Sequence, residues 1–286
     1  MHKHVTLAAL LTALKRKEKG FLYLETHAGR GAYDLADSAE SRASAPIIER
    51  VIGSAGPRTA TSRADSADRR DGSAAPDGAV HPEIAAYTQA IASWRAGTGR
   101  PLAYPGSPLI AAMQLRPQDR AVLIELLPDE AAALGRGLAA WPRLKVVNAD
   151  GFERLKAFLP PSERRGLTFI DPPYEETQQD FARVAASIAE ALRRFATGII
   201  AVWYPIKDAR DTAAWLATVR PRISRETLVS ELWLHPCDSR VALNGSGLLI
   251  INPPHGIAER MRAWLPALHA LLDAPGAGGC RVLPVE

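Results

Sequence analysis

The tetrapeptide Asp171-Pro172-Pro173-Tyr174 carries the side chains of this chain that are best suited to chemistry. It follows the apolar run Gly166–Ile170, which is typical of a buried strand. Proline supplies no N–H, so the adjoining carbonyl of Pro172 is free to accept a hydrogen bond. Asp171 and this carbonyl suit the two N–H groups of an exocyclic amine, with Tyr174 stacked on the ring. The tetrapeptide therefore predicts an amino group as methyl acceptor, and an ordinary proline turn is the alternative.

The composition favours an enzyme of the α/β class. A chain of 286 residues with 47% hydrophobic content can form one large domain, or one domain with an insertion. No apolar stretch reaches the roughly 18 residues of a membrane span, and no signal peptide is evident, so we expect a cytoplasmic protein. Cys237 and Cys280 lack the spacing of a zinc site, which predicts no metal. The net charge of +4 is compatible with a polyanionic partner but decides nothing.

The chain alternates between strand and helix patterns. An amphipathic helix over 5–17 precedes a strand over 21–26, and four more strands are predicted at 121–126, 144–148, 166–170 and 197–204. Helices are predicted at 128–140, 152–159, 180–195 and 208–219, and the segments 226–234 and 246–251 suggest an antiparallel pair. This alternation predicts a Rossmann-like class I methyltransferase fold with a seven-stranded, mostly parallel sheet and an antiparallel terminal strand.

An insertion interrupts this pattern. We predict a Rossmann-like domain formed by residues 1–33 and 104–286, and a helical insertion over 34–103. Short helices are expected at 45–52 and 82–94. Between them the segment around 53–80 is rich in small and polar residues, which predicts a flexible low-complexity loop.

Three strand ends carry residues suited to a nucleoside-type ligand. Gly29 lies in the turn His27-Ala28-Gly29-Arg30-Gly31 after the first strand, where glycine lets the main chain approach a ligand. Glu125 at the next strand end can accept both hydroxyls of a ribose, or form a salt bridge. Asp150-Gly151 can bind an adenine, the aspartate accepting its amino group, or can be a simple turn.

A second motif, Asn252-Pro253-Pro254-His255, imitates the first one but lacks the carboxylate and the tyrosine. We interpret it as a turn at the sheet edge. Many lysine and arginine residues also lie near the first helix and in the second half of the chain, where they can contact phosphates or form a solvated face.

Several stretches together resemble the bacterial 23S rRNA adenine-N6 methyltransferases of the J type, which belong to the wider group of Asp-Pro-Pro-Tyr amino-methyltransferases. The matching residues are 3–5, 21–29, 104–109, 149–151, 164–167, 171–175, 194–198, 203–205 and 252–254. The resemblance implies S-adenosylmethionine contacts at His4, His27, Ser107, Glu125, Asp150, Gly151 and Asp171, in addition to Gly29. It also implies that Asp171 is the catalytic residue.

The resemblance leads us to expect N6-methylation of a specific adenine in 23S rRNA by direct transfer from S-adenosylmethionine. Asp171, Pro172 and Tyr174 are expected to be catalytic, and Lys3 and Tyr174 to contact the substrate. The adenine has to leave its stack, which favours naked or partly assembled RNA. We expect a monomer that has no membrane partner.

The chain departs from the family at its start. Family members begin with an arm that bears a Tyr-Arg-His motif, whereas Met1 lies almost at the Lys3-His4 pair. A late start codon or a truncated chain would explain this difference. Two alternatives therefore stay open: a DNA adenine-N6 methyltransferase, and a non-catalytic RNA-binding protein that lacks the arm.

Overall fold

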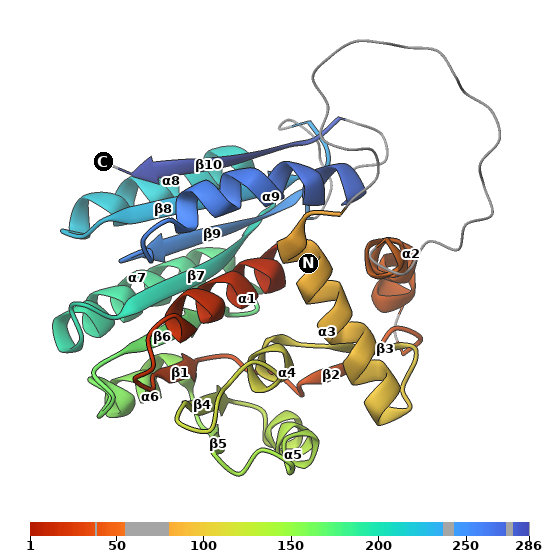
Figure 1. Ribbon diagram of the computed structural model, residues 1–286. Coiled ribbons are helices and arrows are strands. Elements are labelled where there is room, and N and C mark those ends of the chain that lie inside the picture. The colour runs from red at the N-terminus through yellow and green to blue at the C-terminus, as the bar shows by residue number, and fades with distance from the viewer. Residues whose placement is uncertain (38, 55–79, 237–242, 273–276, 286) are drawn as a thin grey trace.

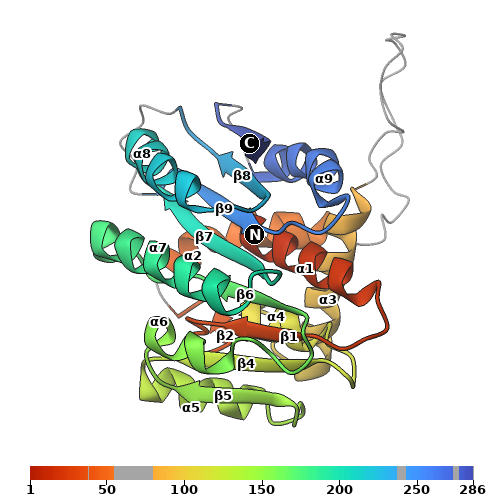
Figure 2. The same cartoon turned by 90° about the vertical axis from the view of Figure 1, so that its left-hand side faces the viewer.

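The structure is a computed structural model that describes residues 1–37, 39–54, 80–236, 243–272 and 277–285. Its centre is an eight-stranded sheet with the strand order β10-β8-β9-β7-β6-β1-β4-β5. Helices cover both faces of the sheet (Figures 1 and 2). The strands are β1 (Leu22–Glu25), β4 (Arg120–Glu125), β5 (Leu144–Asn148), β6 (Gly166–Ile170), β7 (Ile199–Ile206), β8 (Thr227–Trp233), β9 (Gly245–Ile251) and β10 (Gly279–Val285).

The sheet topology confirms the predicted fold class. Strands β5, β4, β1, β6 and β7 are parallel neighbours, so their carboxyl ends meet at one edge. Strand β9 runs antiparallel between β7 and β8, and β8 is antiparallel to β9, as the predicted terminal pair requires. Strand β10 is an eighth strand that the sequence analysis does not predict, and it pairs antiparallel with β8.

Helices connect most of these strands. They are α1 (His2–Lys15), α2 (Ala39–Gly53), α3 (Pro82–Thr98), α4 (Ser107–Ala112), α5 (Pro128–Gly137), α6 (Gly151–Arg154), α7 (Thr177–Arg194), α8 (Ala209–Val219) and α9 (Ile257–Leu272). Short 3-10 helices, η1 (Leu155–Phe158) and η2 (Arg220–Arg222), follow α6 and α8. Helices α4 and α9 are absent from the sequence prediction.

The alternation of side chains along each strand divides the core into two layers. In β1, Tyr23 packs into a cluster with α1, α3, α4, α5 and α9, whereas Leu22 and Leu24 pack into a second cluster with η1, α7 and α8. In β4, Leu123 and Ile124 divide in the same way. Strands with both faces covered need apolar side chains at almost every position. Their position between two helix layers leaves the strand ends as the places where polar groups can gather.

The insertion begins and ends in a two-stranded ribbon. Strand β2 (Ala32–Asp34) pairs antiparallel with β3 (Ala103–Pro105), and helices α2 and α3 lie between them in the sequence. The two helices predicted at 45–52 and 82–94 are confirmed as parts of α2 and α3. The division into domains 1–33 with 104–286 and 34–103 stays a prediction. The loop expected around 53–80 lies outside the described residues, apart from its ends.

The described residues contain neither a membrane-spanning helix nor a cluster of metal ligands. None of the helices in those parts of the chain is both long and apolar enough to cross a membrane. No group of three or more His, Cys, Asp or Glu side chains there is arranged to hold a metal ion.

Candidate active site

A cavity of about 590 Å³ opens at the edge where the carboxyl ends of the parallel strands meet. The volume lies within the range of about 300–1,000 Å³ that small-molecule sites occupy. Eight of its lining residues are site residues that the sequence analysis predicts, and Trp203 of β7 lines it too. The eight are Lys3, His4, His27, Gly29, Ser107, Glu125, Asp171 and Pro172.

Asp171 lies directly after β6, where the chain leaves the sheet. Its carboxylate is only 9% exposed, and Oδ2 accepts a hydrogen bond from Nζ of Lys3 at 2.5 Å. The Lys3 ammonium also lies over the Trp203 ring, 5.3 Å from its centroid. Within the described parts of the chain, Oδ1 of Asp171 accepts no hydrogen bond. One carboxylate oxygen is therefore held by a cation while the other remains for a ligand.

Tyr174 does not face the cavity in this structure. Its side chain is fully buried, and its hydroxyl donates a 2.6 Å hydrogen bond to the carbonyl of Trp203. Its ring contacts Phe181 and Trp203 edge-on. The residue has φ 55°, a left-handed conformation that turns the side chain into the core behind the loop. The predicted stacking of Tyr174 on a base is thus not available in this conformation, and Tyr174 supports the loop instead.

Gly29 and Glu125 are in direct contact at neighbouring strand ends. The backbone N–H of Gly29 donates to Oε2 of Glu125 at 2.7 Å, and the N–H of Leu127 donates to Oε1 at 2.9 Å. A Cβ on Gly29 would collide with the hydroxyl of Tyr33, and its φ of 65° also favours glycine. Each carboxylate oxygen keeps a second lone pair for a ligand. The arrangement suits a diol such as a ribose.

Asp150 lies beside the cavity without lining it. Oδ1 caps helix α6 by accepting the N–H groups of Phe152 and Glu153, and Oδ2 accepts from Arg183 at 2.5 Å. Burial raises the pKa of this carboxyl, but these donors outweigh burial and leave it below its ordinary value. Gly151 packs against the carbonyl of Thr26, where a Cβ would collide. Both residues shape the ends of β1 and β5, and contact with an adenine stays a prediction.

His27 forms part of the wall between β1 and α6. Its Nδ1 lies 2.8 Å from the Thr26 hydroxyl, and its ring contacts Phe152 edge-on at a centroid distance of 4.6 Å. Burial lowers the pKa of the imidazole to about 4. The ring is therefore neutral near pH 7 and can contact an aromatic ligand without carrying charge into the cavity.

Glu25 is a functional candidate that the sequence analysis missed. It ends β1, is fully buried, and accepts hydrogen bonds from Ser107 at 2.5 Å and from Tyr23 at 2.9 Å. Burial raises the pKa of its carboxyl to about 8. The sequence could have indicated Glu25, because it is an acidic residue at the end of an apolar strand, the same pattern that singled out Glu125. Ser107, which only the family resemblance singled out, links Glu25 to the cavity wall.

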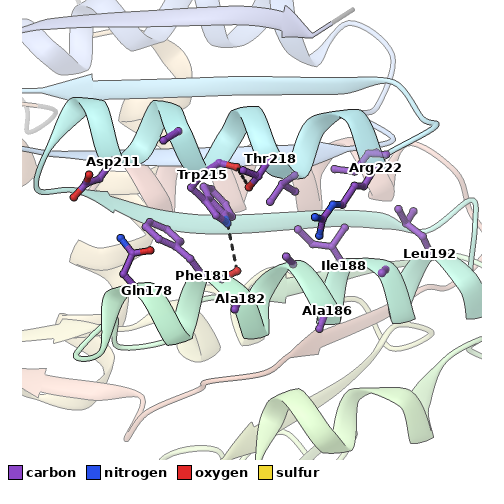
Figure 3. A pocket seen from close by; sticks show the side chains of 15 residues that line it. Gln178, Phe181, Ala182, Ala186, Ile188, Leu192, Asp211, Trp215, Thr218 and Arg222 are labelled. Atoms are coloured by element: carbon purple, nitrogen blue, oxygen red, sulfur yellow. Dashed lines mark hydrogen bonds between the residues drawn. The ribbon is translucent and has the colours of Figure 1, made fainter.

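A second hollow lies between α7 and α8, and Figure 3 shows its side chains. Its volume is about 570 Å³, but it is lined mainly by alanine, Ile188, Leu192 and Trp215. Asp211 is the carboxylate among its lining residues, and the Trp215 N–H donates to the carbonyl of Phe181. None of the predicted site residues lines this groove, so we do not assign it to the reaction.

The residues of the first cavity fit S-adenosylmethionine. A glycine turn without side-chain obstruction lies at the end of β1, and the acceptor oxygens of Glu125 are held in place at the end of β4. The wall also carries both acidic side chains and the Lys3 ammonium. This mixture of charges suits S-adenosylmethionine, which has a cationic ammonium, a cationic sulfonium and an anionic carboxylate. These residues, with His4 and Ser107, are those that would hold it.

Comparisons with known proteins place this chain in a family. A family model described as "Ribosomal RNA large subunit methyltransferase D, RlmJ" matches residues 76–284. A protein of Escherichia coli named ribosomal RNA large subunit methyltransferase J is 36% identical over 282 residues, which cover 98% of this chain and 92% of that protein. A protein of Haemophilus influenzae with the same name is 36% identical over 280 residues, with the same coverage.

A solved structure shares the whole fold. The crystal structure of a protein from Legionella pneumophila is 32% identical and has a TM-score of 0.80, covering 99% of this chain and 95% of that one. The family model spans more than half of the chain, and the two named relatives align with almost all of it. The chain therefore belongs to the RlmJ family of ribosomal RNA large subunit methyltransferases.

Proposed function

We propose that this protein transfers a methyl group from S-adenosylmethionine to N6 of a specific adenine in 23S rRNA. The observation that carries this proposal is the position of Asp171, whose carboxylate lines the same cavity as Gly29 and Glu125. The relatives named ribosomal RNA large subunit methyltransferase J support RNA as the class of substrate.

Adenine N6 is a weak nucleophile because its lone pair is delocalised into the ring. Oδ1 of Asp171 and the carbonyl of Pro172 accept its two N–H groups, which orients the lone pair toward the methyl donor. The carboxylate also stabilises the positive charge that develops on the nitrogen. Lys3 holds the other oxygen of Asp171 and so fixes the direction of the accepting lone pair.

S-adenosylmethionine supplies an electrophilic methyl group, whose bond to sulfur breaks as its bond to N6 forms, leaving S-adenosylhomocysteine. The methylated nitrogen then loses one proton, and we assign Asp171 as its acceptor. Glu125 and Gly29 hold the donor at the opposite wall. No covalent intermediate with the protein is needed, because the transfer is a single displacement.

The target base needs an aromatic contact once it is extruded from its stack. Tyr174 was predicted to provide it, but its ring is buried, whereas Trp203 lines the cavity and shares the Lys3 ammonium with Asp171. Its indole N–H donates to Ser246 at 2.7 Å, and Tyr174 contacts its edge. We therefore assign the stacking contact to Trp203 and a supporting role to Tyr174.

The experiment compares methyl transfer from tritiated S-adenosylmethionine to naked 23S rRNA, to assembled large subunits and to duplex DNA. We expect label in naked RNA, recovered as N6-methyladenosine after digestion. Label in DNA alone would favour the DNA methyltransferase. Binding of RNA without transfer to any of the three would favour the non-catalytic alternative.

A matched pair of aspartate variants ties this activity to the cavity. Asp171→Ala should abolish transfer, whereas Asp211→Ala in the groove between α7 and α8 should leave it unchanged. We also expect a cytoplasmic monomer. Sedimentation with and without RNA measures the oligomeric state.

A further inference from the structure

The inner side of the cavity is joined to the insertion by three aromatic side chains in a row. Nδ1 of His4, in the first turn of α1, lies 2.7 Å from the hydroxyl of Tyr104 in β3. That hydroxyl forms a short hydrogen bond with the hydroxyl of Tyr87 in α3. All three side chains are buried, and the rings of His4 and Tyr104 are stacked at 5.5 Å. The row thus connects α3 to a residue that lines the cavity.

The other nitrogen of His4, Nε2, is buried and has no hydrogen-bond partner among the described residues. A buried polar atom without a partner is costly, so such atoms commonly mark a ligand contact. Burial, with a smaller effect of Lys3, lowers the pKa of His4 well below its ordinary value. The neutral ring carries one N–H, and its position decides whether Nε2 donates or accepts.

Counting protons along the row shows which direction a ligand can complete. If His4 donated from Nδ1 to Tyr104, then Tyr104 would donate to Tyr87, and the Tyr87 proton would need an acceptor. Tyr104 is the only hydrogen-bond partner of Tyr87 in the parts of the chain that the structure describes. In the opposite direction, Tyr87 donates to Tyr104 and Tyr104 donates to Nδ1, so both hydroxyl protons are used. The one proton left over then lies on Nε2 of His4, a cavity residue, where a ligand can accept it.

We propose that Tyr104 and Tyr87 are positioning residues that hold His4 as the Nε2–H tautomer, so that His4 donates a hydrogen bond to an acceptor oxygen of the methyl donor. The donor's carboxylate is its charged acceptor and is the group we assign. This inference rests on the proposed function only for the identity of the ligand. The direction of the row is a property of the protein itself.

The proposal gives the insertion a task within the reaction. Helix α3 is capped by His81 and is anchored to β3 by the Arg95 guanidinium, which donates to the carbonyl of Ala103 at 2.7 Å. Arg95 also pairs with Glu49 of α2. A helix pair outside the main sheet thereby sets the hydrogen-bonding role of one cavity residue.

Nitrogen NMR of the free protein with ¹⁵N-labelled histidine tests the tautomer. His4→Gln serves only to assign the His4 signals. We expect a protonated Nε2 and an unprotonated, hydrogen-bonded Nδ1 in the wild type, and a mixture of tautomers in Tyr104→Phe. Tyr87→Phe should keep the tautomer but weaken the bond to Nδ1. A proton on Nδ1 of wild-type His4 would overturn the proposal.

Calorimetric binding of S-adenosylhomocysteine tests the link to the ligand. We expect Tyr104→Phe to weaken binding about tenfold and Tyr87→Phe by roughly threefold. Tyr204→Phe is the matched control, because Tyr204 is equally buried but donates to Glu231 on the far side of the sheet. Unchanged affinity in folded Tyr104→Phe would overturn the link to the donor.

The two measurements also separate this inference from the proposed function. A wild-type protein that binds no S-adenosylhomocysteine would refute the proposed function, while the tautomer in the free protein would still be decided by NMR. A protein that binds the donor and methylates RNA but shows the wrong tautomer would refute only the inference.

Discussion

Two strand ends in this protein carry nearly the same pattern, and only one of them lies at the cavity. Asp171-Pro172-Pro173 follows β6, and Asn252-Pro253-Pro254 follows β9. Strand β9 is antiparallel to β7, so its carboxyl end lies at the amino ends of the parallel strands. There the Asn252 amide donates to the carbonyls of Ala196 and Gly198 at 3.0 and 2.7 Å.

The difference teaches that strand direction decides what a proline-rich strand end can do. At the end of β6 the polar side chain meets the glycine turn, the acids and the lysine of four other elements. At the end of β9 the corresponding residue, Asn252, donates to two backbone carbonyls and so has a structural role. The interpretation of Asn252-Pro253-Pro254-His255 as a sheet-edge turn is confirmed by these two hydrogen bonds.

The largest expected effect separates the two ends by activity. Asp171→Ala removes the acceptor of the amine and should lower the rate of methyl transfer by about 10²–10³-fold or more, the size found for single electrostatic groups in active sites. Single-turnover kinetics with saturating RNA measures it. Binding of S-adenosylhomocysteine should be largely kept, and a variant that still transfers at the normal rate would remove Asp171 from the mechanism.

The second prediction separates the ends by stability. Asn252→Ala leaves two carbonyls without their donor and places alanine at φ 53°, so the free energy of unfolding should fall by about 1–3 kcal/mol. Urea unfolding measures this change. Methyl transfer by the folded variant should match the wild type, and a loss of activity without a loss of stability would contradict the comparison.

The third prediction concerns the donor side of the catalytic end. Glu125→Gln replaces one acceptor oxygen by an NH₂ group that faces a backbone N–H of Gly29 or Leu127. We expect the affinity for S-adenosylhomocysteine to fall about tenfold. Glu130→Gln is a suitable control, because Glu130 also lines the cavity but pairs with the exposed Arg30. Equal losses in both variants would indicate a general charge effect.

The fourth prediction is a pH dependence that the other end, with its neutral amide, does not have. Burial raises the pKa of Glu25 from an ordinary value of 4.5 to about 8. Between these values the folded protein binds more protons than the unfolded chain, so the free energy of unfolding contributed by Glu25 falls as pH rises. Above about pH 8 the contribution is constant.

Glu25→Gln isolates this contribution, because glutamine keeps the shape of the side chain and does not titrate. Urea unfolding of both proteins at several pH values from 5 to 8 measures the difference between them. The wild type should lose stability relative to the variant as pH rises. A difference that is independent of pH would show that Glu25 is ionised throughout.

Much of the site at the end of β6 was predictable because local sequence patterns mark its residues. The strands that carry Glu125 and Asp171 are short apolar runs bounded by polar residues, and the polar residue at each carboxyl end marks the site. The parallel order of the strands then brings these ends together. The family resemblance added His4 and Ser107, which belong to helix starts that no periodicity connects to the sheet.

The remainder depended on contacts that sequence patterns do not carry. Helix α9 contains Pro266, and β10 contains Pro284 and follows a glycine-rich stretch, so neither has a regular signal. The burial of Tyr174 follows from its positive φ, which its residue type does not suggest. The partners of Glu25 and His4 come from residues about 80 and 100 positions away.

The first helix has a consequence for the order in which the molecule becomes functional. His2 hydrogen-bonds Ser246 of β9 and Ser230 of β8, while the next residue, Lys3, donates to the carboxylate of Asp171. His2 and Ser246 are 244 positions apart, so these contacts form only after β9 has been synthesised. A nascent chain that already contains every lining residue of the cavity still lacks the strand that seats Lys3. Because such long-range contacts carry a high loop-closure cost, we expect the start of α1 to be seated late in folding.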